Sequence, residues 1–291
     1  MNMPTFMVLG AQKAGTTWLH ECLQEHPAVF MPQIKELHFF SRAEDNRFSR
    51  RHLGFDWYLA QFSDAAGKVA GEATPDYMFY PYVAKELHEF NPDLKLIFML
   101  REPVDRAYSA YWMWRRHTPD LPPFEDVITR HPEFLDRGRY FTQISRFLEL
   151  FPREQIFVAI YERATAHPEE FFKSLFTFLK IDPTFVPAAA SSSVGGTRIL
   201  PGLRGMLLYK VVSPIINLSF ILPIWRKLRR TRVRPLLWSL LGAKSTSGEA
   251  QAYEPLPTDA RARLTAQFSA ENQKLSALLG DDLREWTTSA G

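Results

Sequence analysis

The chain has 291 residues, of which 46% are hydrophobic and 23% are charged, a composition that excludes a largely disordered protein. The formal net charge of +3 excludes a uniformly basic nucleic-acid binder, so an anionic partner has to be recognised by local clusters of charge. The single cysteine, Cys22, excludes an internal disulfide framework and a cysteine-based zinc site.

Short apolar runs alternate with amphipathic segments along the chain, which is the pattern of an α/β fold with a parallel sheet covered on both faces. The expected strands are residues 6–9, a short strand near Val29, and residues 68–71, 95–100 and 155–160. The expected helices are residues 16–25, 103–116, 168–179 and 257–280. Pro103 and Pro168 each open a helix, because proline suits the first helical turn. We expect the last helix to pack back on the sheet.

Two stretches interrupt this alternation. Residues 187–205 are rich in small residues and are typical of a long loop whose backbone can approach a ligand closely. Residues 206–224 are strongly apolar, but charged, amide and proline residues interrupt them, and a membrane-spanning helix needs about 20 apolar residues. A basic run follows at residues 226–234. Two interpretations stay open: residues 206–234 cover the functional site, or they contact anionic lipid headgroups.

The strongest functional signal is the sequence GAQKAGTT between the first strand and the first helix. A glycine-rich turn that enters a helix directs amide hydrogens and the positive end of the helix dipole at one point, which suits a phosphate. Gly10 and Gly15 have the spacing of a nucleotide-binding P-loop, but Thr16 stands where that motif has lysine, and the cation is Lys13. The residue after the next long strand is Arg101, where a magnesium-dependent NTPase would need an aspartate. We therefore expect a polyanionic nucleotide without an essential metal, with a tight turn carrying an incidental lysine as the alternative.

Three more segments follow this loop within the first 110 residues. They are KELHFF at residues 35–40, GEATPDY at 71–77 and LREPVDRAYS at 100–109. With QKAGTT at 12–17, they resemble, in order, the motifs of the sulfotransferases that use 3′-phosphoadenosine 5′-phosphosulfate (PAPS). The similarity is to the heparan sulfate sulfotransferases and their bacterial relatives, and weaker matches extend over nearly the whole chain.

The resemblance implies a P-loop-like three-layer α/β fold with a central parallel sheet flanked by helices. It also implies transfer of a sulfuryl group from PAPS to a hydroxyl of a small molecule, lipid or saccharide by in-line displacement, with 3′-phosphoadenosine 5′-phosphate (PAP) as the product and no metal required. Such catalysis consists mainly of positioning and of neutralising the charge that grows on the leaving oxygen.

The resemblance assigns nucleotide binding to the first loop, to the end of the second long strand and to a later loop. These residues are Gln12, Lys13, Ala14, Gly15, Thr16, Thr17, Arg101, Ser109, Gly195, Gly196, Thr197 and Arg198. Lys13 is expected to act on the leaving phosphate oxygen as a catalytic residue. Arg101 offers a forked cation to the 3′-phosphate, assisted by Ser109. The alternative for Arg101 is a surface ion pair with Glu102 or Asp105.

An acceptor alcohol is a poor nucleophile until a general base takes its proton. The resemblance assigns this role to Glu36, with His38 beside the acceptor as a second catalytic residue. A histidine base remains the alternative, because the ordinary pKa of histidine is nearer neutrality. Without the resemblance, we would interpret Glu36 as a charged residue at the end of a helix and His38 as a histidine that packs in the core.

Acceptor binding is expected at Glu36, His38, Glu72, Thr74 and Tyr77. Many heparan sulfate relatives have lysine where Ala73 stands, so a heavily sulfated polysaccharide is a less suitable acceptor. We expect one cytoplasmic domain over residues 1–291, with 187–245 covering the nucleotide or acceptor site and no nucleic-acid partner. The oligomeric state is left open. The competing functions are a P-loop kinase or NTPase and a non-catalytic, membrane-peripheral anion-binding protein.

Overall fold

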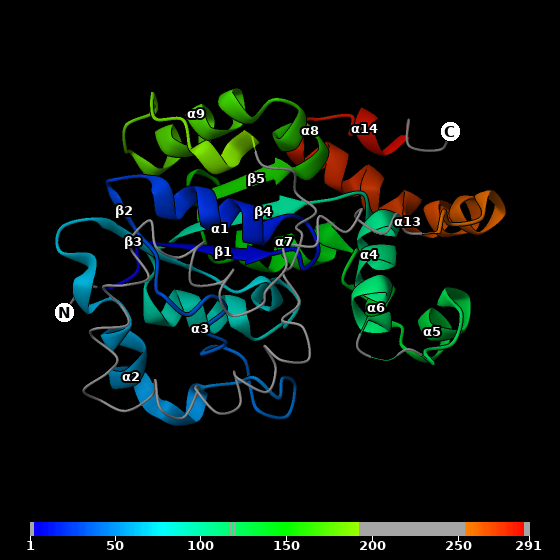
Figure 1. Ribbon diagram of the computed structural model, residues 1–291, viewed down its shortest axis with the longest axis horizontal. Helices are drawn as coiled ribbons and strands as arrows, with labels where there is room; N and C mark the ends of the chain where they lie inside the picture. The colour runs from blue at the N-terminus through cyan, green and yellow to red at the C-terminus, as the bar shows by residue number, and fades with distance from the viewer. Residues whose placement is uncertain (1–2, 117, 119, 192–253, 288–291) are drawn as a thin grey trace, which may run out of the picture. The chain divides into compact units, whose positions relative to one another are not determined.

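The core of the protein is a parallel sheet. A computed structural model of the chain describes residues 3–116, 118, 120–191 and 254–287. Within these residues, five strands form the sheet in the order β2-β3-β1-β4-β5 (Figure 1). The strands are β1 (Phe6–Gly10), β2 (Val29–Phe30), β3 (Val69–Ala73), β4 (Lys95–Leu100) and β5 (Ile156–Ile160). The predicted α/β class and central parallel sheet are confirmed, and the strands lie at or next to their expected positions.

The central strand β1 is completely buried, since it pairs with β3 on one side and with β4 on the other. Burial on both faces explains why its sequence is continuously apolar instead of alternating. The register places Phe6 opposite Gly71 of β3. A Cβ atom at residue 71 would lie 2.4 Å from Cζ of the Phe6 ring, so this glycine gives the ring its space.

Helices connect and cover the strands. The described helices are α1 (Thr16–Glu25), α2 (Gly54–Ala60), α3 (Val83–Phe90), α4 (Pro103–Arg115), α5 (Phe124–Arg130), α6 (Glu133–Asp136), α7 (Tyr140–Leu148), α8 (Tyr161–Ala166), α9 (Pro168–Leu179), α13 (Thr258–Leu279) and α14 (Arg284–Thr287). The connections that follow β1 and β3 run in opposite directions across the sheet, so the right-handed crossover rule puts α1 on one face and α3 and α7 on the other. On the first face Trp18 of α1 stacks on Phe171 of α9 at 5.7 Å, and on the second Phe98 of β4 meets Phe147 of α7 at 5.2 Å.

The long helix near the carboxyl terminus, α13, begins after Pro257 and ends at Gly280, as expected. Gly280 closes the helix with a left-handed conformation, φ 64°. We expected this helix to pack on the sheet, but its main neighbours are α7 and α4. Its Phe268 ring lies against Gly138 and belongs to a small apolar cluster built around α4 and α5.

Several expectations concern residues that the structure does not describe. Gly195, Gly196, Thr197, Arg198 and the segment 206–234 all lie outside the described residues, so their assigned roles stay predictions. The described residues up to 191 and from 255 onward belong to one compact unit. Among the helices that the structure does describe, none combines the length and the apolar character needed to cross a bilayer.

Candidate active site

The predicted functional segments meet at one edge of the sheet. β3, β1 and β4 are adjacent and parallel, so the residues after Ala73, Gly10 and Leu100 emerge together. With a strand spacing of about 4.8 Å, the outer two of these strand ends are roughly 10 Å apart. The chain leaves β1 toward β2 and leaves β4 toward β5, in opposite directions across the sheet. Open α/β sheets bind ligands at such a reversal of strand order.

The loop between β1 and α1, residues 11–15, leads into the first turn of α1, and we call it the cradle. The N–H of Ala11 donates to the carbonyl of Met99 on β4 at 2.6 Å, which ties the loop to the neighbouring strand. Gly15 has φ 81° and Thr16 is the first residue of α1. In α1, all of which is described, the first turn contains no acidic residue. The helix dipole and its amide groups are therefore available to an anion.

Lys13 and Arg101 lie close together in this cradle. Arg101 Nη1 donates a long hydrogen bond of 3.4 Å to the carbonyl of Lys13, and the guanidinium lies 5.2 Å from the centre of the Tyr161 ring. Among the described residues, Arg101 Nε is buried and has no hydrogen-bond partner. The Lys13 ammonium approaches Sδ of Met113 on α4 at 3.7 Å. Arg101 thus brings a cation with an unsatisfied donor to the loop that carries Lys13.

The alternative pairing of Arg101 with Glu102 or Asp105 is not what the structure shows. Glu102 caps α4 by accepting hydrogen bonds from the N–H groups of Val104 and Asp105. Both carboxylates also contact Arg261 of α13. Ser109, the other expected 3′-phosphate residue, is buried on α4, with 6% of its surface exposed.

The segment with residues 35–40 is fastened to the end of β3. The N–H of Glu36 donates to the carbonyl of Ala73 at 3.1 Å. Arg50 Nη1 donates to the carbonyls of Glu36, at 2.8 Å, and of Leu37, at 3.1 Å. Glu36 therefore stands beside β1 on the side opposite Arg101.

The three residues expected to be catalytic share an unusual backbone conformation. Lys13 has φ 71°, Glu36 has φ 62° and His38 has φ 50°. Side chains with a Cβ rarely adopt this left-handed region, and such residues are concentrated at functional sites. The other non-glycine residues with positive φ among those described are Ala66, Lys180 and Leu283.

The Glu36 carboxylate is held between two donors. Lys35 Nζ contacts its Oε1 atom, and His38 Nε2 lies 3.5 Å from its Oε2 atom. Burial by itself raises the pKa of Glu36, but the hydrogen bond from His38 and the charge of Lys35 outweigh burial and lower the pKa to about 2. Burial, assisted by the charge of Lys35, also lowers the pKa of His20 on α1 to about 4. Glu36 is thus anionic and His20 neutral at neutral pH.

Three expected acceptor residues, Glu72, Thr74 and Tyr77, are buried beneath this segment. Glu72 accepts hydrogen bonds from the hydroxyls of Tyr58, at 2.6 Å, and of Thr74, at 2.7 Å. The Tyr77 hydroxyl accepts from the N–H of Phe40 at 3.1 Å. Tyr77 thus contacts residues 35–40 directly, and Glu72 fixes Thr74, whose hydroxyl accepts from the N–H of His38 at 3.5 Å. Their direct contact with an acceptor stays a prediction.

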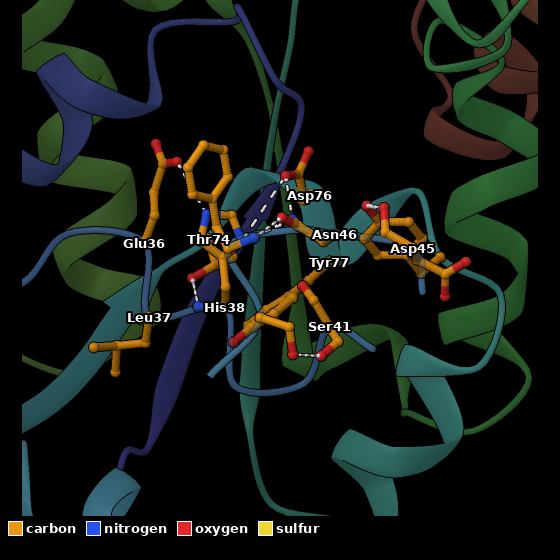
Figure 2. A network of polar contacts seen from close by, with 12 residues as sticks. Glu36, Leu37, His38, Ser41, Asp45, Asn46, Thr74, Asp76 and Tyr77 are labelled. Atoms are coloured by element: carbon orange, nitrogen blue, oxygen red, sulfur yellow. Dashed lines mark hydrogen bonds and ion pairs between the residues drawn. The ribbon is translucent and has the colours of Figure 1, made fainter. Parts of the chain in front are cut away.

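A polar chain behind His38 was not predicted (Figure 2). Asn46 Nδ2 lies 3.1 Å from Nδ1 of His38 and donates to Oδ2 of Asp76 at 3.0 Å. Arg137 Nη1 donates to the other oxygen of Asp76 at 2.7 Å. Asp76 lies inside the GEATPDY segment, so this motif could have indicated that Asp76 lies near the site. Asn46 and Arg137 belong to none of the four motifs.

Comparison with known proteins identifies the family and supports the fold. A family model described as the sulfotransferase domain matches residues 3–193. The chain belongs to the sulfotransferase family. A solved sulfotransferase from Alicyclobacillus acidocaldarius superposes with a TM-score of 0.71 and 25% sequence identity, covering 99% of this chain and 100% of that one.

Curated relatives of this sulfotransferase are similar over part of their length. The membrane-associated sulfotransferase kil1 of Dictyostelium discoideum is 33% identical over 144 residues, which are 46% of this chain and 29% of that protein. Mouse heparan sulfate glucosamine 3-O-sulfotransferase 6 is 30% identical over 176 residues, which are 57% of this chain and 49% of that protein. The matched region thus spans less than half of either relative.

The titratable side chains of the candidate site are joined in ion pairs and in chains of hydrogen bonds. Within the described part of the molecule, no group of three or more histidine, cysteine, aspartate or glutamate side chains is placed to hold a metal ion. The polar groups at the sheet edge are instead cations from the β1 and β4 loops, and a carboxylate–histidine pair beside β3.

Proposed function

We propose that the chain transfers a sulfuryl group from PAPS to an acceptor hydroxyl. The observation that carries this proposal is the arrangement around β1, where Lys13 and Arg101 lie on one side and Glu36 on the other. This arrangement supplies cations for a nucleotide and a carboxylate for an acceptor. Membership of the sulfotransferase family supports the reaction class.

The residues of the cradle suit a nucleotide with phosphates at two positions. The first loop offers amide groups and the ammonium of Lys13 to the 5′-phosphosulfate. Arg101, with a buried Nε that lacks a hydrogen-bond partner among the described residues, offers a donor to the 3′-phosphate. When bound, PAPS supplies the activated sulfuryl group and a phosphate leaving group.

The chain's own side chains have distinct tasks in the reaction. The acceptor oxygen forms a bond to sulfur while the bond from sulfur to the 5′-phosphate oxygen breaks. Lys13 neutralises the charge that grows on that phosphate oxygen. The acceptor hydroxyl loses its proton, and Glu36 takes it as general base.

The low pKa of Glu36 in the free protein follows from its contact with Lys35 and His38. In this proposal the acceptor hydroxyl takes the place of the Lys35 ammonium at Oε1. Loss of this ion pair raises the pKa of Glu36 toward its ordinary value, because a neighbouring cation lowers the pKa of a carboxyl group. Acceptor binding therefore makes the carboxylate a stronger base.

The acceptor side holds one cation fewer than the resemblance implies. Ala73, which stands where many heparan sulfate enzymes have lysine, is 1% exposed and forms the end of β3. A densely sulfated chain gains less from this site than a neutral alcohol, since fewer positive charges compensate its anions. We therefore propose an acceptor that carries few sulfate groups.

Calorimetry with nucleotides tests the proposal. PAP should bind more tightly than AMP or ATP with EDTA present, because only PAP has a phosphate at the ribose 3′ position. A charge-assisted hydrogen bond contributes about 1.5 to 3 kcal/mol, or roughly a 10- to 100-fold difference in affinity. Arg101→Gln should reduce this preference. Equal affinity of the unmodified protein for PAP and AMP would contradict the assignment.

A further inference from the structure

The orientation of the Asn46 amide is determined by its neighbours. The backbone N–H of Phe48 donates to Asn46 Oδ1 at 2.8 Å, so the oxygen has to face Phe48. The Nδ2 group then faces Asp76 and His38, at 3.0 and 3.1 Å. The reverse orientation would put an NH₂ group against the Phe48 N–H and an oxygen against the Asp76 carboxylate. Arg137 fixes Asp76 from the far side.

This orientation decides which nitrogen of His38 carries the proton. Asn46 Nδ2 is a donor, so Nδ1 of His38 has to accept with its lone pair. In a neutral imidazole the proton is then on Nε2. Nε2 is the atom that lies 3.5 Å from Glu36 Oε2, a distance that can shorten when a ligand binds. The His38 side chain is 6% exposed, which keeps water from replacing these partners.

We infer that Asn46, supported by Asp76 and Arg137, is a positioning residue that holds His38 in the Nε2–H form. Its catalytic consequence rests on the proposed function. His38 then donates to Glu36 Oε2 and cannot take the acceptor's proton at Nε2, which already carries one. The acceptor O–H bond breaks, its proton goes to Glu36 Oε1, and its electron pair forms the new bond to sulfur. This hydrogen-bond geometry therefore favours Glu36 over His38 as the general base.

The form of His38 can be measured without any substrate. Two-dimensional NMR of the full chain labelled with ¹⁵N-histidine distinguishes a ring protonated at Nε2 from one protonated at Nδ1. The His38 signals are assigned by their loss in His38→Gln. We expect the neutral ring to be in the Nε2–H form. Observation of the Nδ1–H form would overturn the inference, whatever the enzyme's activity.

Asn46→Asp tests the consequence for catalysis. A carboxylate at position 46 accepts a hydrogen bond, so the proton of the neutral His38 ring should move to Nδ1 and the donor to Glu36 should be lost. Turnover should fall about 10- to 100-fold, the effect of one hydrogen bond lost to a charged group, while PAP affinity changes less than about twofold. The matched control is Asn91→Asp. Asn91 likewise accepts from the backbone N–H two residues later, at 3.0 Å, and its Nδ2 donates to Pro4.

The two experiments separate the inference from the function on which it rests. Native turnover in Asn46→Asp, together with a changed ring form, would overturn the positioning role. Loss of PAP affinity in the same variant would indicate a structural role instead. If the unmodified protein bound PAP no better than AMP, the proposed function would fail, and the NMR result would still decide the form of His38.

Discussion

The carboxyl group of Glu36 is subject to two opposing influences. Partial burial favours its neutral form, whereas Lys35 and His38 favour the anion, and the net effect lowers its pKa to about 2. A buried glutamate without such partners would have a raised pKa. The pKa of Glu36 is lowered instead because the two donors lie within two residues of it and their contacts depend on the left-handed turns of this segment.

Glu36→Gln should lower turnover by about 10² to 10⁴, because it keeps the shape of the side chain and removes the base. Folding and PAP affinity should be retained. Turnover is measured at saturating PAPS, with His38→Ala in parallel. Near-native turnover of Glu36→Gln, combined with an inactive His38→Ala, would make the histidine the base.

The pH dependence gives a second readout of the same substitution. A pKa of about 2 means that Glu36 in the free enzyme stays ionised as the pH falls from 7 to 4. The ratio of kcat/KM between the unmodified enzyme and Glu36→Gln should therefore stay constant over this range. A ratio that shrinks on acidification would show that Glu36 takes up a proton there and that its pKa is not lowered.

At the scale of elements, the strands that carry the site were predictable because their boundaries are local. Gly10, Arg101 and Pro103 follow or bound apolar runs that are buried on both faces, and this pattern needs no knowledge of distant residues. The chain of polar contacts that links His38, through Asn46 and Asp76, to Arg137 was not predictable in this way. Asn46 and Asp76 are 30 residues apart, and Asp76 and Arg137 are 61 apart, so only the folded sheet brings them together.

The pairing of β1 with β3 depends on the space that Gly71 leaves for Phe6. Gly71→Ala should destabilise the protein by about 1 to 3 kcal/mol, because the added Cβ would lie 2.4 Å from the ring and force it to move. Urea unfolding measures the loss. Phe6→Leu removes the ring atoms that would collide. The double variant should therefore lose less stability than the sum of the two single variants, and strict additivity would contradict this account of the contact.

At the scale of the whole molecule, the carboxyl-terminal residues are connected to the turn after β4 that carries Arg101. Trp286 is 5% exposed, and its Nε1 donates to Glu162 Oε2 at 3.2 Å. The other oxygen of Glu162 accepts from the N–H of Glu102 at 2.9 Å, directly after Arg101. The Tyr140 ring lies 5.8 Å from that of Trp286, and its hydroxyl donates to the Arg101 carbonyl at 2.8 Å. Residues from the middle of the chain and from its carboxyl-terminal end thus hold the turn that presents Arg101.

Trp286→Phe keeps most of the apolar packing of this side chain and removes its N–H donor. The lost hydrogen bond should cost about 0.5 to 1.5 kcal/mol of stability. Because the same bond fixes Glu162 against the Arg101 turn, PAP affinity should also fall, by roughly 2- to 10-fold, whereas AMP affinity should change less. Calorimetry of both nucleotides measures the difference. Trp57→Phe on α2, away from β4, is the control and should leave both affinities unchanged. Equal weakening of PAP and AMP binding by Trp286→Phe would mean that the carboxyl-terminal contact supports the fold generally and does not position Arg101 for a 3′-phosphate.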